Sequence, residues 1–125
     1  DLLSLIISSC QNSLNEENIK WDNRFALTIV MASEGYPNDC KVGYEIKGIN
    51  KIQNLKDIYV YHAGTKKVND LIFTNGGRVL NITSLGETVK AANCNALNAI
   101  KMIDWRGSYH RNDIGWRAIK REENE

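Results

Sequence analysis

The sequence has few of the residues that build metal centres and disulfide frameworks. Its three cysteines, Cys10, Cys40 and Cys94, are an odd number without a C-x-x-C spacing, and its two histidines, His62 and His110, lie far apart. These spacings disfavour both a disulfide framework and a zinc site. Three reduced thiols in a cytoplasmic protein are the better interpretation. We expect no metal ligand in this chain.

Long apolar runs and a strong excess of one charge are also missing. No apolar run approaches the roughly 20 residues of a membrane-spanning helix. Sixteen Lys and Arg residues face fifteen Asp and Glu residues, for a net charge of +1, whereas nucleic-acid-binding domains usually show a basic excess. We therefore expect neither a membrane nor a nucleic acid as a partner.

The 125 residues are enough for one domain with a real core, so we expect a single domain over 1–125. Asp1-Leu2-Leu3 reads as the opening of a helix, with neither an initiator Met nor a signal sequence before it. We therefore expect the chain to be cut from a longer protein. At the other end, residues 120–125 are charged and are expected to form a frayed tail.

Hydrophobic spacing predicts strands grouped between two helices. Apolar residues at helical spacing indicate a helix over about 2–14, and a second apolar face runs from Val89 to Ile103. Strands are expected over 25–32, 42–47, 58–62, 71–74 and 78–83. This order is typical of an antiparallel α+β domain rather than a βαβ array.

Three local signals make this prediction more specific. Apolar residues at almost every position of 25–32 indicate a strand covered on both faces. Asn75-Gly76 is a strong signal for a tight hairpin turn between 71–74 and 78–83. Ser84 followed by Glu87 fits a capping box, which places the start of the second helix at Ser84.

An anion site is the most informative functional signal. Gly76 and Gly77 leave backbone without a Cβ, and Arg78 adds a permanent cation whose fork matches phosphate or carboxylate oxygens. Arg111 and Arg117 are further candidates. They flank an aspartate, so a structural Arg–Asp pair and a ligand role have about equal weight. Lys66, Lys67 and Arg121 fit solvated surface charges better.

The chain shows no self-sufficient catalytic set. His62 and Thr65 can be drawn as a pair, but a hydrogen-bonded, partly buried histidine is the better interpretation of His62 than a general base. No G-x-S-x-G motif, phosphate-binding G-x-x-x-x-G-K-[ST] loop or G-x-G-x-x-G fingerprint occurs. We therefore assign no catalytic residue to this chain.

Several motifs, taken in order, carry a resemblance to a known family. The chain resembles the C-terminal domain of phosphoribosylamine–glycine ligases over roughly residues 1–119. The motifs are Ala26-Leu27-Thr28-Ile29-Val30-Met31-Ala32, Gly35-Tyr36-Pro37, His62-Ala63-Gly64-Thr65, Thr74-Asn75-Gly76-Gly77-Arg78-Val79-Leu80, and Trp105, Tyr109, Arg111 and Asp113-Ile114-Gly115-Trp116-Arg117-Ala118.

The resemblance implies a role within a larger enzyme. Such ligases are ATP-grasp enzymes of purine biosynthesis that join glycine to 5-phosphoribosylamine with ATP and magnesium. The ATP and metal residues of the family lie upstream, so this chain alone is expected to be inactive. Its partners would be the N-terminal and ATP-grasp domains, against which it closes the active-site cleft. Its fold would resemble the barrel-like C-terminal modules of biotin carboxylase relatives, with an antiparallel sheet flanked by an N-terminal and a C-terminal helix.

Within that cleft the expected substrate contacts are Gly76, Gly77, Arg78, His62, Thr65, Arg111 and Arg117. Two other classes of protein stay open on the sequence alone. One is a standalone module that binds a small anion without chemistry of its own. The other is a structural domain whose motifs serve interdomain packing.

Overall fold

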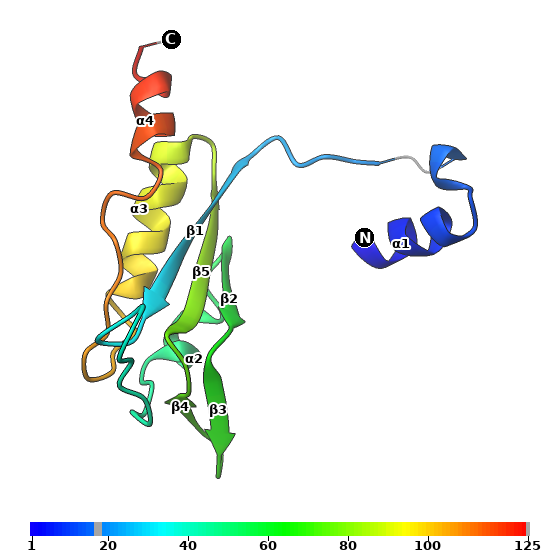
Figure 1. Cartoon of the computed structure of the whole chain (residues 1–125). Coiled ribbons are helices and arrows are strands. Elements are labelled where there is room, and N and C mark those ends of the chain that lie inside the picture. Colours follow the sequence, from blue (N-terminus) through cyan, green and yellow to red (C-terminus); the bar gives the residue numbers. More distant parts are fainter. Residues whose placement is uncertain (17–18, 125) are drawn as a thin grey trace.

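The structure is a computed structural model that describes residues 1–16 and 19–124. Its elements in chain order are α1 (Leu2–Cys10), the 3₁₀ turn η1 (Leu14–Glu16), β1 (Phe25–Ala32), α2 (Ile49–Ile52), β2 (Ile58–His62), β3 (Thr65–Val68), β4 (Leu71–Thr74), β5 (Arg78–Gly86), α3 (Val89–Ile100) and α4 (Trp116–Glu122). This order confirms the predicted α+β class (Figure 1). None of the described helices has the length and apolar character needed to cross a membrane.

The strands form two separate antiparallel sheets. The larger sheet has the order β1-β5-β2, and the smaller one pairs β3 with β4. A barrel closes only when both edges of a sheet are paired. In the part of the chain that the structure describes, β1 and β2 pair with no strand other than β5, and β1 adds only an isolated bridge from Ala32 to Tyr109, so the expected barrel-like sheet is wrong. The two predicted helices are present as α1 and α3, but α1 ends at Cys10 rather than near residue 14 and does not flank the sheet. Helix α4 was not predicted.

The tight hairpin lies at a different place from the predicted one. Strand β4 pairs with β3, and Val68 stands opposite Leu71 across a two-residue turn. Both turn residues, Asn69 (φ 47°) and Asp70 (φ 66°), adopt the left-handed conformation that such turns need. The predicted turn at Asn75-Gly76 is therefore wrong. That segment instead connects the small sheet to β5, the central strand of the large sheet.

Strand β1 confirms its predicted bounds but is buried on one face only. Leu27, Ile29 and Met31 are buried, whereas Thr28 and Val30 between them are exposed. Helix α3 covers one face of the sheet, and no described element covers the other. The strand predicted over 42–47 is also wrong, because this segment makes only isolated bridges with Phe73 and Asp104.

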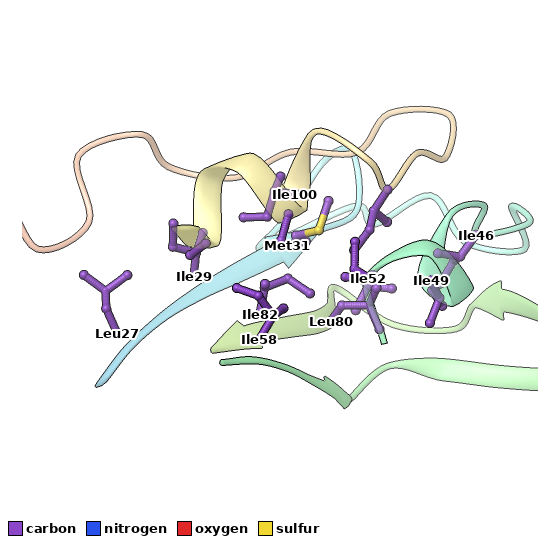
Figure 2. Packing of buried hydrophobic residues seen from close by; sticks show 14 of the residues in the cluster. Leu27, Ile29, Met31, Ile46, Ile49, Ile52, Ile58, Leu80, Ile82 and Ile100 are labelled. Carbon is purple, nitrogen blue, oxygen red and sulfur yellow. The ribbon is translucent and has the colours of Figure 1, made fainter. Parts of the chain in front are cut away.

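Helix α3 packs against β5 and β1 and completes the core. Small residues on its inner side, Ala92, Ala96 and Ala99, are buried and let the helix approach the sheet closely. Figure 2 shows the large core side chains, among them Leu27, Ile29, Met31, Leu80, Ile82 and Ile100, gathered between helix and sheet. The predicted apolar helix face is thereby confirmed from Val89 to Ile100, whereas Ile103 is buried but lies beyond the end of the helix.

The predicted cap of α3 is wrong by four residues. Ser84 lies in β5, where it is fully buried and its hydroxyl donates to the Ala92 carbonyl. Thr88 is the N-cap instead, and its hydroxyl accepts from the Ala91 amide at 3.0 Å. Both residue types suit an N-cap, so the continuation of β5 past Ser84 decides between them.

The two ends of the chain differ in how they pack. Helix α1 stands apart from the sheets in Figure 1, with Leu2, Leu3 and Ile6 exposed. At the other end α4 runs to Glu122, whose carboxylate accepts from the Val89 amide at 2.6 Å. Residues 120–122 are therefore helical, and the expected frayed tail from 120 onward is wrong for them; Glu125 lies outside the described residues.

Candidate functional site

An open hollow of about 580 Å³ lies where the glycine-rich segment enters β5. Three stretches of chain line it. Strand β1 and the loop after it contribute Val30, Tyr36, Pro37 and Cys40. The link between β2 and β3 contributes Ala63 and Gly64, and β5 with the residue before it contributes Gly77, Arg78 and Asn81. The structure thus brings two of the predicted site residues, Gly77 and Arg78, into one concave surface, with Gly76 next to them.

The glycines are required by close packing of backbone on backbone. A Cβ on Gly64 would lie 2.8 Å from the Gly76 Cα and 2.7 Å from the Arg78 carbonyl oxygen. A Cβ on Gly77 would lie 2.6 Å from the Tyr36 ring and 2.9 Å from the Cys40 sulfur. These glycines therefore hold three chain segments together at the hollow.

Hydrogen bonds fix the backbone of this segment on both sides. The Asn75 amide donates to the Gly64 carbonyl at 2.7 Å, and the Gly64 amide donates to the Arg78 carbonyl at 2.8 Å. The carbonyls of Gly76 and Gly77 accept from the Ser33 hydroxyl and amide, respectively. No described residue accepts a hydrogen bond from the amide of Gly76 or of Gly77. Gly77 lines the hollow, so its amide is a donor without a described partner there, and Gly76 next to it has a second.

Arg78 is a cation in this hollow that has no ion-pair partner among the described residues. Its side chain is exposed, and it makes no ion pair or aromatic contact with any residue the structure describes. By contrast, Arg24 and Arg111 are held by aspartates. A guanidinium without a charged partner in the same hollow as the Gly77 amide is a suitable surface for an anionic oxygen.

The loop on the other side of the hollow is closed by an ion pair. Lys41 Nζ lies 2.8 Å from Glu34 Oε1, and the Lys41 amide donates to the Glu34 carbonyl at 3.0 Å. The hydrogen bond from the Lys41 ammonium lowers the pKa of Glu34, and the same bond raises the pKa of Lys41. This pair holds the ends of the loop that carries Tyr36 and Cys40.

His62 lies on a different hollow, and Thr65 is hydrogen-bonded to His62. His62 Nδ1 is 3.1 Å from the Thr65 hydroxyl, which confirms the predicted hydrogen bond. The His62 side chain is exposed, so its expected partial burial is wrong. It lines a hollow of about 510 Å³ together with Lys67 and Asp70.

Arg111 and Arg117 lie on a third hollow, of about 470 Å³, at the start of α4. Arg111 forms a two-pronged pair with Asp113, with Nε–Oδ1 at 2.8 Å and Nη2–Oδ2 at 2.6 Å. This hydrogen bond lowers the pKa of Asp113 and raises that of Arg111. The Arg117 guanidinium lies 5.3 Å from the centre of the Trp116 ring. The structural Arg–Asp pair weighed for this segment is therefore present.

Sequence reasoning missed several residues of the main hollow. Tyr36 and Pro37 were visible as loop residues, and Gly64 was visible as a break after a strand, but nothing in the sequence joined them to Gly77. Nothing in the sequence linked Cys40 to this hollow, or Ser33 to the glycine segment that it bonds. Across the described residues no group of three or more His, Cys, Asp or Glu side chains could hold a metal ion.

The comparisons with known proteins agree with one another. The family "Phosphoribosylglycinamide synthetase, C domain" matches residues 26–117. The phosphoribosylamine–glycine ligase of Salmonella typhimurium is 45% identical over 125 residues, covering 99% of this chain and 29% of that protein. The ligase of Brucella melitensis is 43% identical over 122 residues, covering 98% and 29%.

A solved structure gives the same result. The crystal structure of phosphoribosylamine–glycine ligase from Thermotoga maritima superposes with a TM-score of 0.68 at 25% identity, over 87% of this chain and 27% of that one. The chain thus spans less than a third of the length of the relatives it matches. The family match includes every residue that lines the main hollow. The chain belongs to the phosphoribosylglycinamide synthetase C-domain family.

Proposed function

We propose that this chain is the C domain of a phosphoribosylamine–glycine ligase that works in the cytoplasm in purine biosynthesis. That ATP-dependent carbon–nitrogen ligase joins glycine to 5-phosphoribosylamine. The glycine carboxylate takes the terminal phosphoryl group of ATP and releases ADP. The amine then attacks the acyl phosphate, and phosphate leaves as the amide forms. The observation that carries this proposal is the family match over the hollow, supported by identities of 43–45% to enzymes of this name.

Within that enzyme the hollow would form one wall of the cleft that holds the phosphoribosyl substrate. Arg78 supplies positive charge, and the amides of Gly76 and Gly77 supply two donors without a described partner. Hydrogen bonds from a guanidinium to phosphate oxygens are strong and directional. Substrate contacts by His62, Thr65, Arg111 and Arg117 stay predictions. His62, Arg111 and Arg117 line other hollows, and Thr65 lies beside His62.

ATP and Mg²⁺ would be bound by the other domains of the enzyme. Magnesium is held by oxygen ligands such as carboxylates, and the described residues do not gather three acidic, histidine or cysteine side chains at one place. We place the metal ligands in those other domains and assign this chain no step in phosphoryl transfer. Its role would be to hold the phosphoribosyl group and exclude water from the cleft.

The uncovered surfaces of the chain would contact those other domains. Val30, Tyr59 and Tyr61 are exposed on the face of the large sheet opposite α3, and Val30 also lines the hollow. Asn81 of β5 stands between Val30 and Tyr61 on this face. A face that combines exposed apolar and polar side chains is a suitable contact surface for the other domains.

A chimaeric enzyme tests the proposal. In it, this chain replaces the matching segment of the Salmonella typhimurium ligase, to which it is 45% identical. Glycine-dependent release of ADP and phosphate is measured with 5-phosphoribosylamine present. We expect ligase activity from the chimaera and none from the 125-residue chain alone. A folded but inactive chimaera would contradict the proposal and favour a module that binds anions without chemistry.

A further inference from the structure

Ser33 makes two hydrogen bonds to consecutive carbonyls of the glycine segment. It follows directly after β1 and is only 2% exposed. Its hydroxyl donates to the Gly76 carbonyl at 2.8 Å, across 43 residues of sequence. Its amide donates to the Gly77 carbonyl at the same distance. One buried residue thus holds both peptide planes of the glycine pair.

The hydroxyl bond also sets where the neighbouring amide lies. In a trans peptide the carbonyl and the N–H point to opposite sides of the plane. Because the Gly76 carbonyl is bound by Ser33, the Gly77 N–H is turned away from Ser33. That N–H is one of the two donors without a described partner at the hollow.

The partner chosen by Ser33 is unusual for a serine. Serine hydroxyls at the ends of elements commonly bond to backbone groups a few residues away. Here the hydroxyl bonds to the Gly76 carbonyl, 43 residues away, in a segment that has no Cβ to restrict it. Two consecutive glycines are conformationally free, so an external restraint is what keeps this peptide in one orientation.

We propose that Ser33 is a positioning residue, which fixes the Gly76-Gly77 peptide so that the Gly77 amide and Arg78 bind the phosphoryl group of the substrate together. This proposal rests on the proposed function, because it assigns a role at the same site. Ser33 itself contacts no substrate. It acts through the backbone of the glycine pair.

Kinetics of the chimaera test this role. The variants are Ser33→Ala, which removes the donor, Ser33→Cys, which keeps its size but donates weakly, and Ser33→Thr, which restores a hydroxyl. Loss of one hydrogen bond of ordinary strength predicts about a fivefold rise in the KM for 5-phosphoribosylamine. The KM for glycine, the KM for ATP and kcat should stay unchanged. Ser33→Thr should bring the KM back toward the wild-type value.

Thr88→Val is the matched control, because it removes a hydroxyl that accepts from the Ala91 amide at 3.0 Å, beyond the end of β5 opposite to Arg78. It should leave all three KM values unchanged. An amide spectrum of the isotope-labelled chain adds a second measurement, in which Ser33→Ala should shift the Gly77 signal.

The outcomes separate the two proposals. An inactive wild-type chimaera counts against the proposed function. An active chimaera whose Ser33→Ala variant keeps its KM for 5-phosphoribosylamine overturns the role of Ser33 alone. A rise in all three KM values together with a lower melting temperature would show general destabilisation and would also overturn it. If Ser33→Ala does not fold, the Ser33→Cys variant decides by the same criteria.

Discussion

Gly64 and Gly76 pack backbone against backbone, so that a Cβ built on Gly64 would come within 2.8 Å of the Gly76 Cα. The contact joins the link after β2 to the segment that enters β5. It explains why both segments carry glycine at these positions. The contact therefore fixes two of the chain segments that line the hollow.

The Gly64→Ala variant should therefore be destabilised. Its new methyl group would meet the Gly76 backbone and, at 2.7 Å, the Arg78 carbonyl oxygen, and neither can move without shifting the sheet. Overpacking of this kind costs about 1–3 kcal/mol. Urea denaturation of the chain measures it, with Ala26→Ser on the exposed side of β1 as the control. An unchanged unfolding free energy would mean that the backbone yields freely here.

Glu122 should stabilise the fold by capping α3 from outside that helix. Its carboxylate accepts from the amides of Val89 at 2.6 Å and Lys90 at 3.2 Å, where the helix dipole favours negative charge. Glu122→Ala should lower the free energy of unfolding by about 1 kcal/mol. Glu123→Ala removes only the exposed pair with Lys90 and should change little. Equal effects of the two variants would contradict the capping role.

The link between Asp22, Arg24 and Asp57 should contribute stability that is lost in acid. Arg24 lies 2.7 Å from both carboxylates, and its hydrogen bond lowers the pKa of Asp22 from 3.8 to about 2. Because the pKa is lower in the folded state, the stabilisation is present above about pH 4 and is lost as the pH falls toward 2. Denaturation of wild type and Asp22→Asn over this range should show a difference that disappears at the acid end. A difference that grows in acid would be the wrong sign.

The left-handed turn at Asn69-Asp70 predicts a specific response to substitution. Asp70→Gly creates the Asn-Gly pair that two-residue hairpins prefer, so it should raise the thermal midpoint. Asp70→Val forces a β-branched residue to φ 66° and should cost about 1 kcal/mol. The same changes at Asn75, where no tight turn forms, serve as controls. A larger change in stability from the substitutions at Asn75 would contradict this placement of the tight turn.

The hairpin shows how much of the fold the sequence could reveal. Strand positions 25–32, 58–62 and 71–74 follow from local composition and are confirmed. Which strands pair does not follow from local composition. Asn75-Gly76 has the stronger turn signal, but β5 pairs with β1 and β2 rather than with β4. Burial of Leu80 and Ile82 between those strands outweighs a local turn preference. Tertiary packing therefore decided the topology.

The candidate site was predictable only in part, for a similar reason. Gly77 and Arg78 carry their own signal, since two glycines before an arginine are unusual inside a sheet. Tyr36 reaches the hollow, and Ser33 reaches the glycine pair beside it, from 40 or more residues away in the sequence. The antiparallel register of β1 with β5 brings them there. Arg111 had an equally strong charge signal, but Asp113 two residues later holds it elsewhere.

The KM of the chimaeric enzyme for 5-phosphoribosylamine, compared between wild type and Arg78→Ala, tests the central claim most directly. Removal of a hydrogen bond between charged groups predicts a rise of about tenfold or more, with the KM for ATP and glycine unchanged. Arg121→Ala is the control, because Arg121 is an exposed arginine on another hollow. Arg78→Lys should recover part of the loss, since the charge remains but the fork is gone. An unchanged KM in the folded Arg78→Ala enzyme would contradict the claim that this hollow binds the phosphoribosyl group.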